Sequence, residues 1–265
     1  MRAPTRLVFI GWGAINSRVG ELLTQRRTPV EIAGIAVRTA EARLPAGVPR
    51  VTSADDLIAL KPDLVIEAAG RAAVSQWAPA ALAAAPALIM TSTSALADDE
   101  TLARLAELAE HRGSRIEIPS GAIGGMDALA GAAVLGLDEV VHQIIKAPRA
   151  WKGTPAEGLL DLDHLRARTV FFSGSAREAA ASYPQNANAT VVTSLAGVGL
   201  DRTRVEMIAD PASTVNGHRI TARGAFGQMD ITLKNMPLAT NPKSSELTAL
   251  NLVRLIEHRV NRLII

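Results

Sequence analysis

Short apolar runs alternate with helical spacing along the first half of the chain. Five runs are apolar at nearly every position, which is typical of strands covered on both faces of a parallel sheet. They span residues 7–10, 30–37, 64–67, 87–90 and 116–118. Between them, apolar residues recur every three or four positions, as on one face of a helix. The helices expected from this spacing cover residues 15–26, 54–60, 77–85 and 101–112.

This repeated alternation predicts parallel strands joined by right-handed crossovers. We therefore expect an α/β fold with a Rossmann-type, doubly wound parallel sheet. The second half differs. A helix is expected at 127–137, and residues 140–146, 204–209, 218–225 and 228–234 alternate like antiparallel strands, the last two as a hairpin that turns near Gly227. These elements predict an α+β domain with a mostly antiparallel open sheet.

The change of pattern predicts two domains. Residues 1–120 and a C-terminal helical segment at 242–265 are expected to form the first, because the amphipathic stretch 246–259 has an apolar face to bury. Residues 121–241 are expected to form the second.

Composition excludes several classes of protein. Of the 265 residues, 48% are hydrophobic, enough for a large core. The 28 basic residues barely exceed the 26 acidic ones and aromatics make up 3%, so no nucleic-acid partner is expected. The absence of cysteine excludes disulfides, zinc–thiolate sites and a cysteine nucleophile, and fits a cytoplasmic location. No apolar stretch reaches the roughly 18 residues of a membrane span, and Gly11 interrupts the first run too early for a signal peptide.

The segment Gly11-Trp-Gly-Ala-Ile-Asn16 follows the first strand and opens the first helix. This is the context of a dinucleotide-binding turn, in which Gly11 allows the tight turn and Gly13 lets the backbone approach a pyrophosphate. The N–H groups of Ala14 and Ile15, at the helix start, would then face that anion. Asn16 stands where the third glycine of the pattern is usual, so Gly20 is expected to provide part of the close helix–strand packing. A plain strand-to-helix turn is the alternative.

The end of the second strand bears on the type of cofactor. A carboxylate about 20 residues after the glycines accepts hydrogen bonds from the ribose of NAD, but Val37-Arg38-Thr39 stands here. Arg38 can pair with the 2′-phosphate of NADP instead. NADP is therefore favoured over NAD, although the nearby Glu41 leaves NAD open, and Arg38 could simply be a solvated loop residue.

Several segments of the second half carry a resemblance to a known family. They are 118–127 (IPSGAIGGMD), 146–152 (KAPRAWK), 183–190 (YPQNANAT), 216–218 (NGH) and 241–248 (NPKSSELT). In this order and spacing, together with the glycine turn, they resemble the L-aspartate dehydrogenase family over nearly the whole chain.

The resemblance implies a homodimeric, NAD(P)-dependent enzyme without a metal, which interconverts L-aspartate with oxaloacetate and ammonia through iminoaspartate. It also implies a possible supply of iminoaspartate to NAD biosynthesis. The second domain would be similar to that of dihydrodipicolinate reductase and would form the dimer contact. The family's catalytic histidine matches His218, and its cofactor contacts match Ala122 and Asn188.

Histidine chemistry agrees with this role. Water addition to an imine needs a group that titrates near neutral pH, and histidine has an unperturbed pKa of about 6.5. Of the five histidines, His111 and His258 lie near expected helix ends, where a cation is favourable. His142 lies in mid-strand and His164 in a polar helical stretch, and neither has an obvious partner. His218 follows the turn pair Asn216-Gly217 at the mouth of a strand. The resemblance makes it the candidate general base toward water and general acid toward the carbinolamine.

A dicarboxylate substrate needs cations or free N–H groups. Lys146, Arg149 and Lys152 lie in one short segment. The following Thr154-Pro-Ala-Glu157 has the pattern of a capping box, which either simply caps a helix or leaves N–H groups at its start for a carboxylate. Lys152, Thr154 and Lys243 are the substrate-binding candidates. The acidic residues around His164 lack the further ligands that a metal site requires.

Two loops are candidates for cofactor contact. Small residues at 120–125 would let backbone amides approach the nicotinamide, or would serve only as a hinge. Asn186 and Asn188 would point to one side if their segment is extended; the alternative is a turn.

Two other functions stay open at this point. One is another imine or keto-acid reductase of the same architecture, such as one like dihydrodipicolinate reductase. The other is a non-catalytic NADP(H)-binding sensor.

Overall fold

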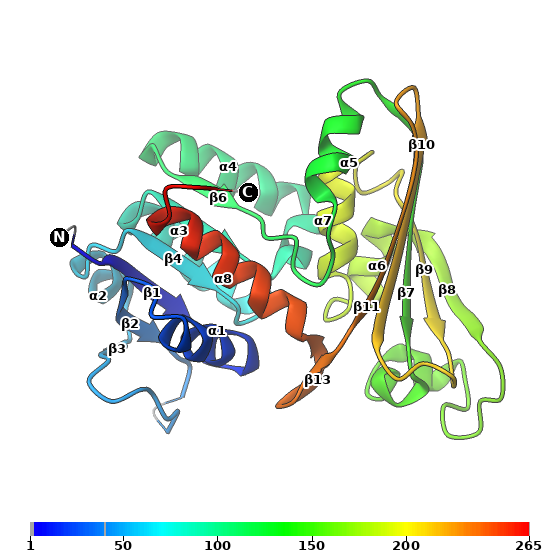
Figure 1. Ribbon diagram of the computed structural model, residues 1–265, viewed down its shortest axis with the longest axis horizontal. Coiled ribbons are helices and arrows are strands. Elements are labelled where there is room, and N and C mark those ends of the chain that lie inside the picture. The colour runs from blue at the N-terminus through cyan, green and yellow to red at the C-terminus, as the bar shows by residue number, and fades with distance from the viewer. Residues whose placement is uncertain (1–2, 40, 265) are drawn as a thin grey trace. The chain divides into compact units, whose positions relative to one another are not determined.

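The structure is a computed structural model that describes residues 3–39 and 41–264 (Figure 1). Internal contacts divide the chain into two units. The first comprises the chain up to Pro119 together with the segment from Ala249 onward, and the second comprises Ser120–Thr248. Residues 241–248 belong to the second unit, because Asn241–Ser245 forms strand β13, which pairs with β12 (Pro237–Leu238). Over the described ranges, no helix has both the length and the apolar character that a membrane crossing requires.

The first unit contains a six-stranded parallel sheet in the order β3-β2-β1-β4-β5-β6. The strands are β1 (Thr5–Ile10), β2 (Val30–Ala36), β3 (Arg50–Val51), β4 (Leu64–Glu67), β5 (Ala87–Met90) and β6 (Arg115–Glu117). The strand order reverses between β1 and β4, as in a doubly wound sheet, and the expected fold class is confirmed. The two-residue strand β3 was not predicted, since it is too short to produce a pattern.

The helices of this unit are α1 (Ala14–Gln25), α2 (Ala54–Ala59), α3 (Arg71–Ala84) and α4 (Asp99–Arg112), with a 3-10 helix, η1, at Thr93–Ala97. Helix α8 (Glu246–Val260) belongs to it from Ala249 onward. The start of α2 follows its capping signal, since Ser53 and Asp56 form a capping box. Helix α3 begins six residues before the expected position 77, because its N-cap is Gly70 and no capping side chain marks the start.

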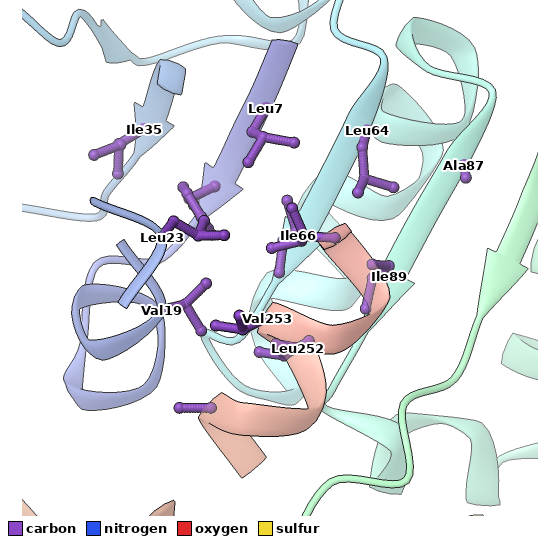
Figure 2. Close-up of a cluster of buried hydrophobic side chains, with 13 residues drawn as sticks. Leu7, Val19, Leu23, Ile35, Leu64, Ile66, Ala87, Ile89, Leu252 and Val253 are labelled. Atoms are coloured by element: carbon purple, nitrogen blue, oxygen red, sulfur yellow. The ribbon is translucent and has the colours of Figure 1, made fainter. Parts of the chain in front are cut away.

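The core of the first unit joins β1, β2, β4 and β5 to helices α1 and α8 (Figure 2). Leu7 and Ile66 from the sheet pack with Val19 from α1 and with Leu252 and Val253 from α8. Burial of each such side chain contributes roughly 1.5–3 kcal/mol. The last helix of the chain thus helps to fix α1, whose N-terminus carries the glycine turn.

The second unit contains a five-stranded sheet in the order β11-β10-β7-β9-β8. Its strands are β7 (Leu137–Lys146), β8 (Thr169–Ser175), β9 (Arg204–Ala209), β10 (Asn216–Gly224) and β11 (Gly227–Asn235). All neighbours pair antiparallel except β7 and β9, so the sheet is mostly antiparallel, as expected. The hairpin of β10 and β11 turns between Gly224 and Gly227, also as expected.

The helices of the second unit are α5 (Met126–Ala133), α6 (Ala176–Ser182) and α7 (Asn188–Ala196), with 3-10 turns η2 (Pro148–Trp151) and η3 (Pro155–Gly158). Helix α5 is shorter than the expected 127–137, because Gly136 adopts a φ of +83° before β7 begins. Strand β8 and helices α6 and α7 were not predicted. Helix α7 is rich in Thr, Val and Ser, which have modest helix propensity, and its burial in the unit decides its structure.

Candidate active site

The glycine turn has the local geometry of a dinucleotide cradle. Gly11 has a φ of +84°, and a Cβ there would lie 2.6 Å from the Cβ of Ala69, so the position requires glycine. Gly13 is the N-cap of α1, and a Cβ on it would meet no atom within 4 Å. Helix α1 has neither a side-chain cap nor an acidic residue in its first turn. The N–H groups at Ala14 and Ile15 therefore meet the requirements of a pyrophosphate.

Asn16 holds the glycine turn closed. Its side chain is fully buried, and Nδ2 donates to the carbonyl oxygens of Ile10 at 3.1 Å and Gly11 at 2.8 Å. The residue in place of the third glycine is thus a structural clamp. Gly20 does allow a close approach, but to the ring of Trp12 in the glycine turn, which a Cβ on Gly20 would meet at 2.6 Å, rather than to a strand.

Arg38 lies at the same edge of the sheet as the glycine turn. Strand β2 ends at Ala36, whose carbonyl accepts a hydrogen bond of 2.7 Å from the N–H of Gly11. Arg38 follows two residues later and is exposed. Its place at the carboxyl end of β2 fits contact with the ribose part of a dinucleotide.

Glu67 lies at the same carboxyl edge of the sheet, and the sequence did not single it out. It ends β4 beside Ile10 of β1 and is 1% exposed. Its carboxylate accepts hydrogen bonds from the N–H groups of Ala69 and Gly70 and from both the N–H and the Oγ of Ser92. Burial raises the pKa of Glu67, but these hydrogen bonds favour its charged form. Glu67 thereby fixes the loop whose Ala69 limits Gly11; the only sequence signal was an acid at the end of an apolar strand.

Two histidines of the second unit contact each other directly. His218 lies on β10 and His142 on the neighbouring strand β7, and both are buried. The Nε2 of His142 lies 3.0 Å from the Nδ1 of His218, and the Nδ1 of His142 lies 2.9 Å from the Oγ1 of Thr193 on α7. The expectation that His142 has no partner was wrong, because its partners are 76 and 51 residues away in the sequence.

Both histidines are neutral at pH 7. Burial lowers the pKa of His142 to about 3. Burial also lowers the pKa of His218 well below its usual value, and the nearby His142 and Lys146 lower it further. A neutral imidazole can accept a proton, which is the state that a general base needs.

Lys146 ends β7 near this pair and is 5% exposed. Its Nζ donates to the Oδ1 of Asn186 at 3.2 Å, and lies 5.5 Å from the ring centroid of Trp151. Burial, together with the charge of Lys243, lowers the pKa of Lys146 to about 8. The sequence placed Lys146 in a basic cluster but did not select it; its signal was a lone cation at the end of a buried strand.

The three substrate candidates from the sequence have different surroundings. Lys152 is exposed and forms an ion pair with Asp163. Lys243 lies near enough to Lys146 for its charge to lower the pKa of Lys146. The Nζ of Lys243 donates to the carbonyl of Lys152 at 3.1 Å. Thr154 accepts from the N–H of Ala156 and donates to the carbonyl of Trp151.

The interpretation of residues 154–157 as a carboxylate-binding helix start is not supported. The segment η3 is a four-residue 3-10 helix, too short to supply a helix dipole. Pro155 has no N–H, and the next two N–H groups already have partners: Ala156 donates to the Oγ1 of Thr154, and Glu157 donates to the carbonyl of Thr154.

Ala122 and Asn188 both lie in the second unit and are half-buried. The carbonyl of Ala122 accepts a hydrogen bond of 2.6 Å from the side chain of Asn235. Asn188 begins α7, so it lies one turn before Thr193, the partner of His142. Of the two alternatives for this segment, the turn is found at Asn186, whose N–H donates to the carbonyl of Tyr183.

Comparison with known proteins accounts for both units. Residues 127–259 match the family model described as aspartate dehydrogenase, C-terminal, and residues 11–119 match the NAD binding domain of homoserine dehydrogenase. An L-aspartate dehydrogenase from Brucella anthropi is 50% identical over 263 residues, which cover 98% of each chain. The chain belongs to the aspartate dehydrogenase family. The resemblance noted in the sequence is thereby confirmed.

Solved structures agree with membership of the aspartate dehydrogenase family. The crystal structure of aspartate dehydrogenase from Thermotoga maritima has a TM-score of 0.80 and 27% identity, and the match covers 98% of this chain and 99% of that one. A dihydrodipicolinate reductase from Paenisporosarcina, at a TM-score of 0.54 and 12% identity, covers 96% of this chain and 95% of its own and shares the fold. As an aspartate dehydrogenase family member with an NAD-binding domain, the chain binds a nicotinamide cofactor.

Within residues 3–39 and 41–264, no group of three or more His, Asp or Glu side chains is placed to hold a metal ion. His164, which the sequence places among acidic residues, is exposed and pairs with Asp161 in a turn.

Proposed function

We propose that this chain is an NAD(P)-dependent L-aspartate dehydrogenase that interconverts L-aspartate with oxaloacetate and ammonia through iminoaspartate. The observation that carries the proposal is a buried, neutral His218 whose Nδ1 is bound while no hydrogen bond to its Nε2 occurs among the described residues. Full-length relatives named L-aspartate dehydrogenase at 40–50% identity support the substrate.

The chemistry assigned to His218 is proton transfer around the imine carbon. A bound nicotinamide would supply the acceptor for the hydride of the substrate α-carbon, after the substrate ammonium has lost one proton to solvent. His218 Nε2 then accepts a proton from water as the water oxygen bonds to the imine carbon, which gives a carbinolamine. The same nitrogen returns the proton to the amine as the carbon–nitrogen bond breaks. The carbinolamine hydroxyl proton leaves with the ammonia as ammonium.

Lys146 and Lys243 are the best-placed cations for the substrate carboxylates. Lys146 lies near His218, and Lys243 lies near Lys146. Burial and, next to it, the charge of Lys243 lower the pKa of Lys146, and a carboxylate beside this pair would offset the repulsion between the two cations. Lys152 is a weaker candidate because Asp163 already neutralises its charge, whereas Lys146 and Lys243 donate to neutral oxygens. Thr154 is weaker because its hydroxyl donates to the carbonyl of Trp151 and it carries no charge. Contacts of Ala122 and Asn188 with the cofactor remain part of the proposal, on the family resemblance.

The test is the loss of nicotinamide absorbance with oxaloacetate and ammonium. Oxidation of NADPH or NADH that requires ammonium supports an amino-acid dehydrogenase. Oxidation of another imine or keto acid in its place would support a different reductase of this fold. Cofactor binding without any turnover would support a sensor. His218→Asn, which keeps the size and polarity of the side chain but cannot take up a proton near pH 7, is expected to bind cofactor normally and to lose turnover.

Arg38 is proposed to favour NADP over NAD through the 2′-phosphate. Since hydrogen bonds to charged groups contribute about 1.5–3 kcal/mol, Arg38→Ala should lower the NADPH-to-NADH ratio of kcat/KM by roughly tenfold to a hundredfold. Arg112, an exposed basic residue at the end of α4, lies just before the amino end of β6 and therefore at the opposite edge of the sheet; it provides the matched control. An unchanged ratio in Arg38→Ala would remove Arg38 from the cofactor site.

The enzyme is further proposed to be a homodimer, on the family resemblance, and sedimentation equilibrium tests this. A cytoplasmic location and a supply of iminoaspartate to NAD biosynthesis stay predictions.

A further inference from the structure

We propose that His142 is a positioning residue that, together with Thr193, fixes His218 in the tautomer whose Nε2 is unprotonated. The inference rests on the proposed function, in which His218 Nε2 acts as the base. It follows from the direction of one continuous hydrogen-bond chain through Ala189, Thr193, His142 and His218.

The direction of the chain is set at Thr193. Its hydroxyl donates to the carbonyl of Ala189, one turn earlier in α7, at 3.1 Å. A hydroxyl has one proton, so toward His142 the Oγ1 of Thr193 can only accept. The ring nitrogen of His142 at 2.9 Å, Nδ1, therefore carries the proton of that imidazole.

The position of the proton on His142 decides the position of the proton on His218. A neutral His142 with its proton on Nδ1 has a lone pair on Nε2, and this atom lies 3.0 Å from Nδ1 of His218. His218 must then donate through Nδ1, which leaves the lone pair on its own Nε2. Orientation of a catalytic histidine by a second group bound to its other nitrogen is the general way in which such a tautomer is selected.

The surroundings keep this arrangement uncharged. His142 is fully buried, and burial lowers its pKa to about 3, so it remains an acceptor when His218 takes up a proton. Two titratable groups act on His218: His142 through the shared hydrogen bond, and Lys146 through its charge. A neutral acceptor on Nδ1 thus helps to hold the imidazolium that forms when water gives up its proton.

Substitutions at His142 separate orientation from packing. His142→Leu fills similar space but leaves Nδ1 of His218 without an acceptor. His142→Gln can place an amide oxygen near the position of the original Nε2 and so restores the acceptor. We expect kcat to fall by about tenfold to a hundredfold in His142→Leu, to recover most of that loss in His142→Gln, and the KM for cofactor to stay unchanged in both.

Thr193→Val tests the hydrogen-bond chain at a residue that does not contact His218. The valine keeps the shape of the side chain but cannot accept from His142, so the His142 proton is expected to move to Nε2 and His218 to become protonated on Nε2. The matched control is Thr190→Val on the same helix. Thr190 is also buried and bonds back to the carbonyl of Ala187, yet no hydrogen bond links it to either histidine. Thr193→Val should lower kcat by about tenfold or more, and Thr190→Val should not.

The tautomers themselves can be measured in the wild-type chain, so the inference does not depend on a variant that folds. ¹⁵N chemical shifts of labelled histidines at pH 7.5 should assign His218 as protonated on Nδ1 and unprotonated on Nε2. A His218 protonated on Nε2 would overturn the inference, as would His142→Leu with turnover within twofold of wild type. If wild type lacks ammonium-dependent oxidation, the proposed function fails, while the tautomer assignment stands or falls on the spectrum alone.

Discussion

Gly11 lies against Ala69 so closely that a Cβ on the glycine would stand 2.6 Å from the alanine Cβ. The loop that carries Ala69 is held in turn by the buried carboxylate of Glu67, through the N–H groups of Ala69 and Gly70. The glycine turn and the end of β4 are therefore built as one unit, and the two glycines of the turn differ in what they tolerate.

Gly11→Ala and Gly13→Ala should affect different properties. Gly11→Ala combines a φ of +84° with a steric clash, so it should cost roughly 1–3 kcal/mol and lower the Tm by several degrees. Gly13 has extended backbone (φ −85°) and open space, so an alanine there should leave the Tm nearly unchanged. Its methyl group would still obstruct a pyrophosphate and should raise the Kd for NADPH about tenfold or more. Normal NADPH affinity in Gly13→Ala would place the cofactor elsewhere.

Asn16→Gly, which restores the usual third glycine, should weaken the protein. The substitution removes two buried hydrogen bonds to the carbonyls of Ile10 and Gly11, and we expect a loss of about 1–3 kcal/mol in stability. Asn16→Asp keeps the shape but directs an acceptor at those carbonyls, and it should be less stable still. Thermal unfolding measures both, and an Asn16→Gly variant as stable as wild type would show that the clamp is unimportant.

Lys146→Met should stabilise the chain near neutral pH while it lowers activity. Because the pKa of Lys146 falls from 10.5 unfolded to about 8 folded, the unfolded state binds more protons between these values. Burying the charged Lys146 therefore costs stability, and this cost grows as the pH falls from about 10.5 to about 8 and is constant below that. Methionine removes up to about 3 kcal/mol of this cost at pH 7. Urea unfolding at pH 7 and pH 10 should show the difference between variant and wild type narrowing at the higher pH; a constant difference contradicts it.

The histidine pair should make the chain acid-sensitive. Both pKa values are lower in the folded state, that of His142 to about 3, so protons bind the unfolded state preferentially as the pH falls below about 6.5. Over this range each histidine lowers the free energy of unfolding by about 1.4 kcal/mol for every unit by which the pH falls. His142→Gln should remove one such contribution between pH 6 and pH 4, measured by urea unfolding. An unchanged pH dependence of the unfolding free energy in His142→Gln would contradict this prediction.

The sequence determined the parts of this protein that depend on neighbouring residues. The strands of the parallel sheet follow from continuous apolar runs, since both of their faces are covered. The glycine turn follows from two closely spaced glycines between a strand and a helix. Capping residues such as Ser53 marked helix starts for the same local reason. The segments around His218 were sufficient to indicate the family.

Tertiary structure alone decided what surrounds His218. A single polar residue in a buried strand does not reveal its partner, and the hydrogen bonds of His142 to His218 and of Lys146 to Asn186 join residues 76 and 40 positions apart. Helix α7, which carries Thr193, has too little intrinsic helix propensity to be read from its sequence. Packing within the unit stabilises this helix and places the hydroxyl of Thr193 against His142. Burial also lowers the pKa values of His142 and His218, on which the proposed chemistry depends.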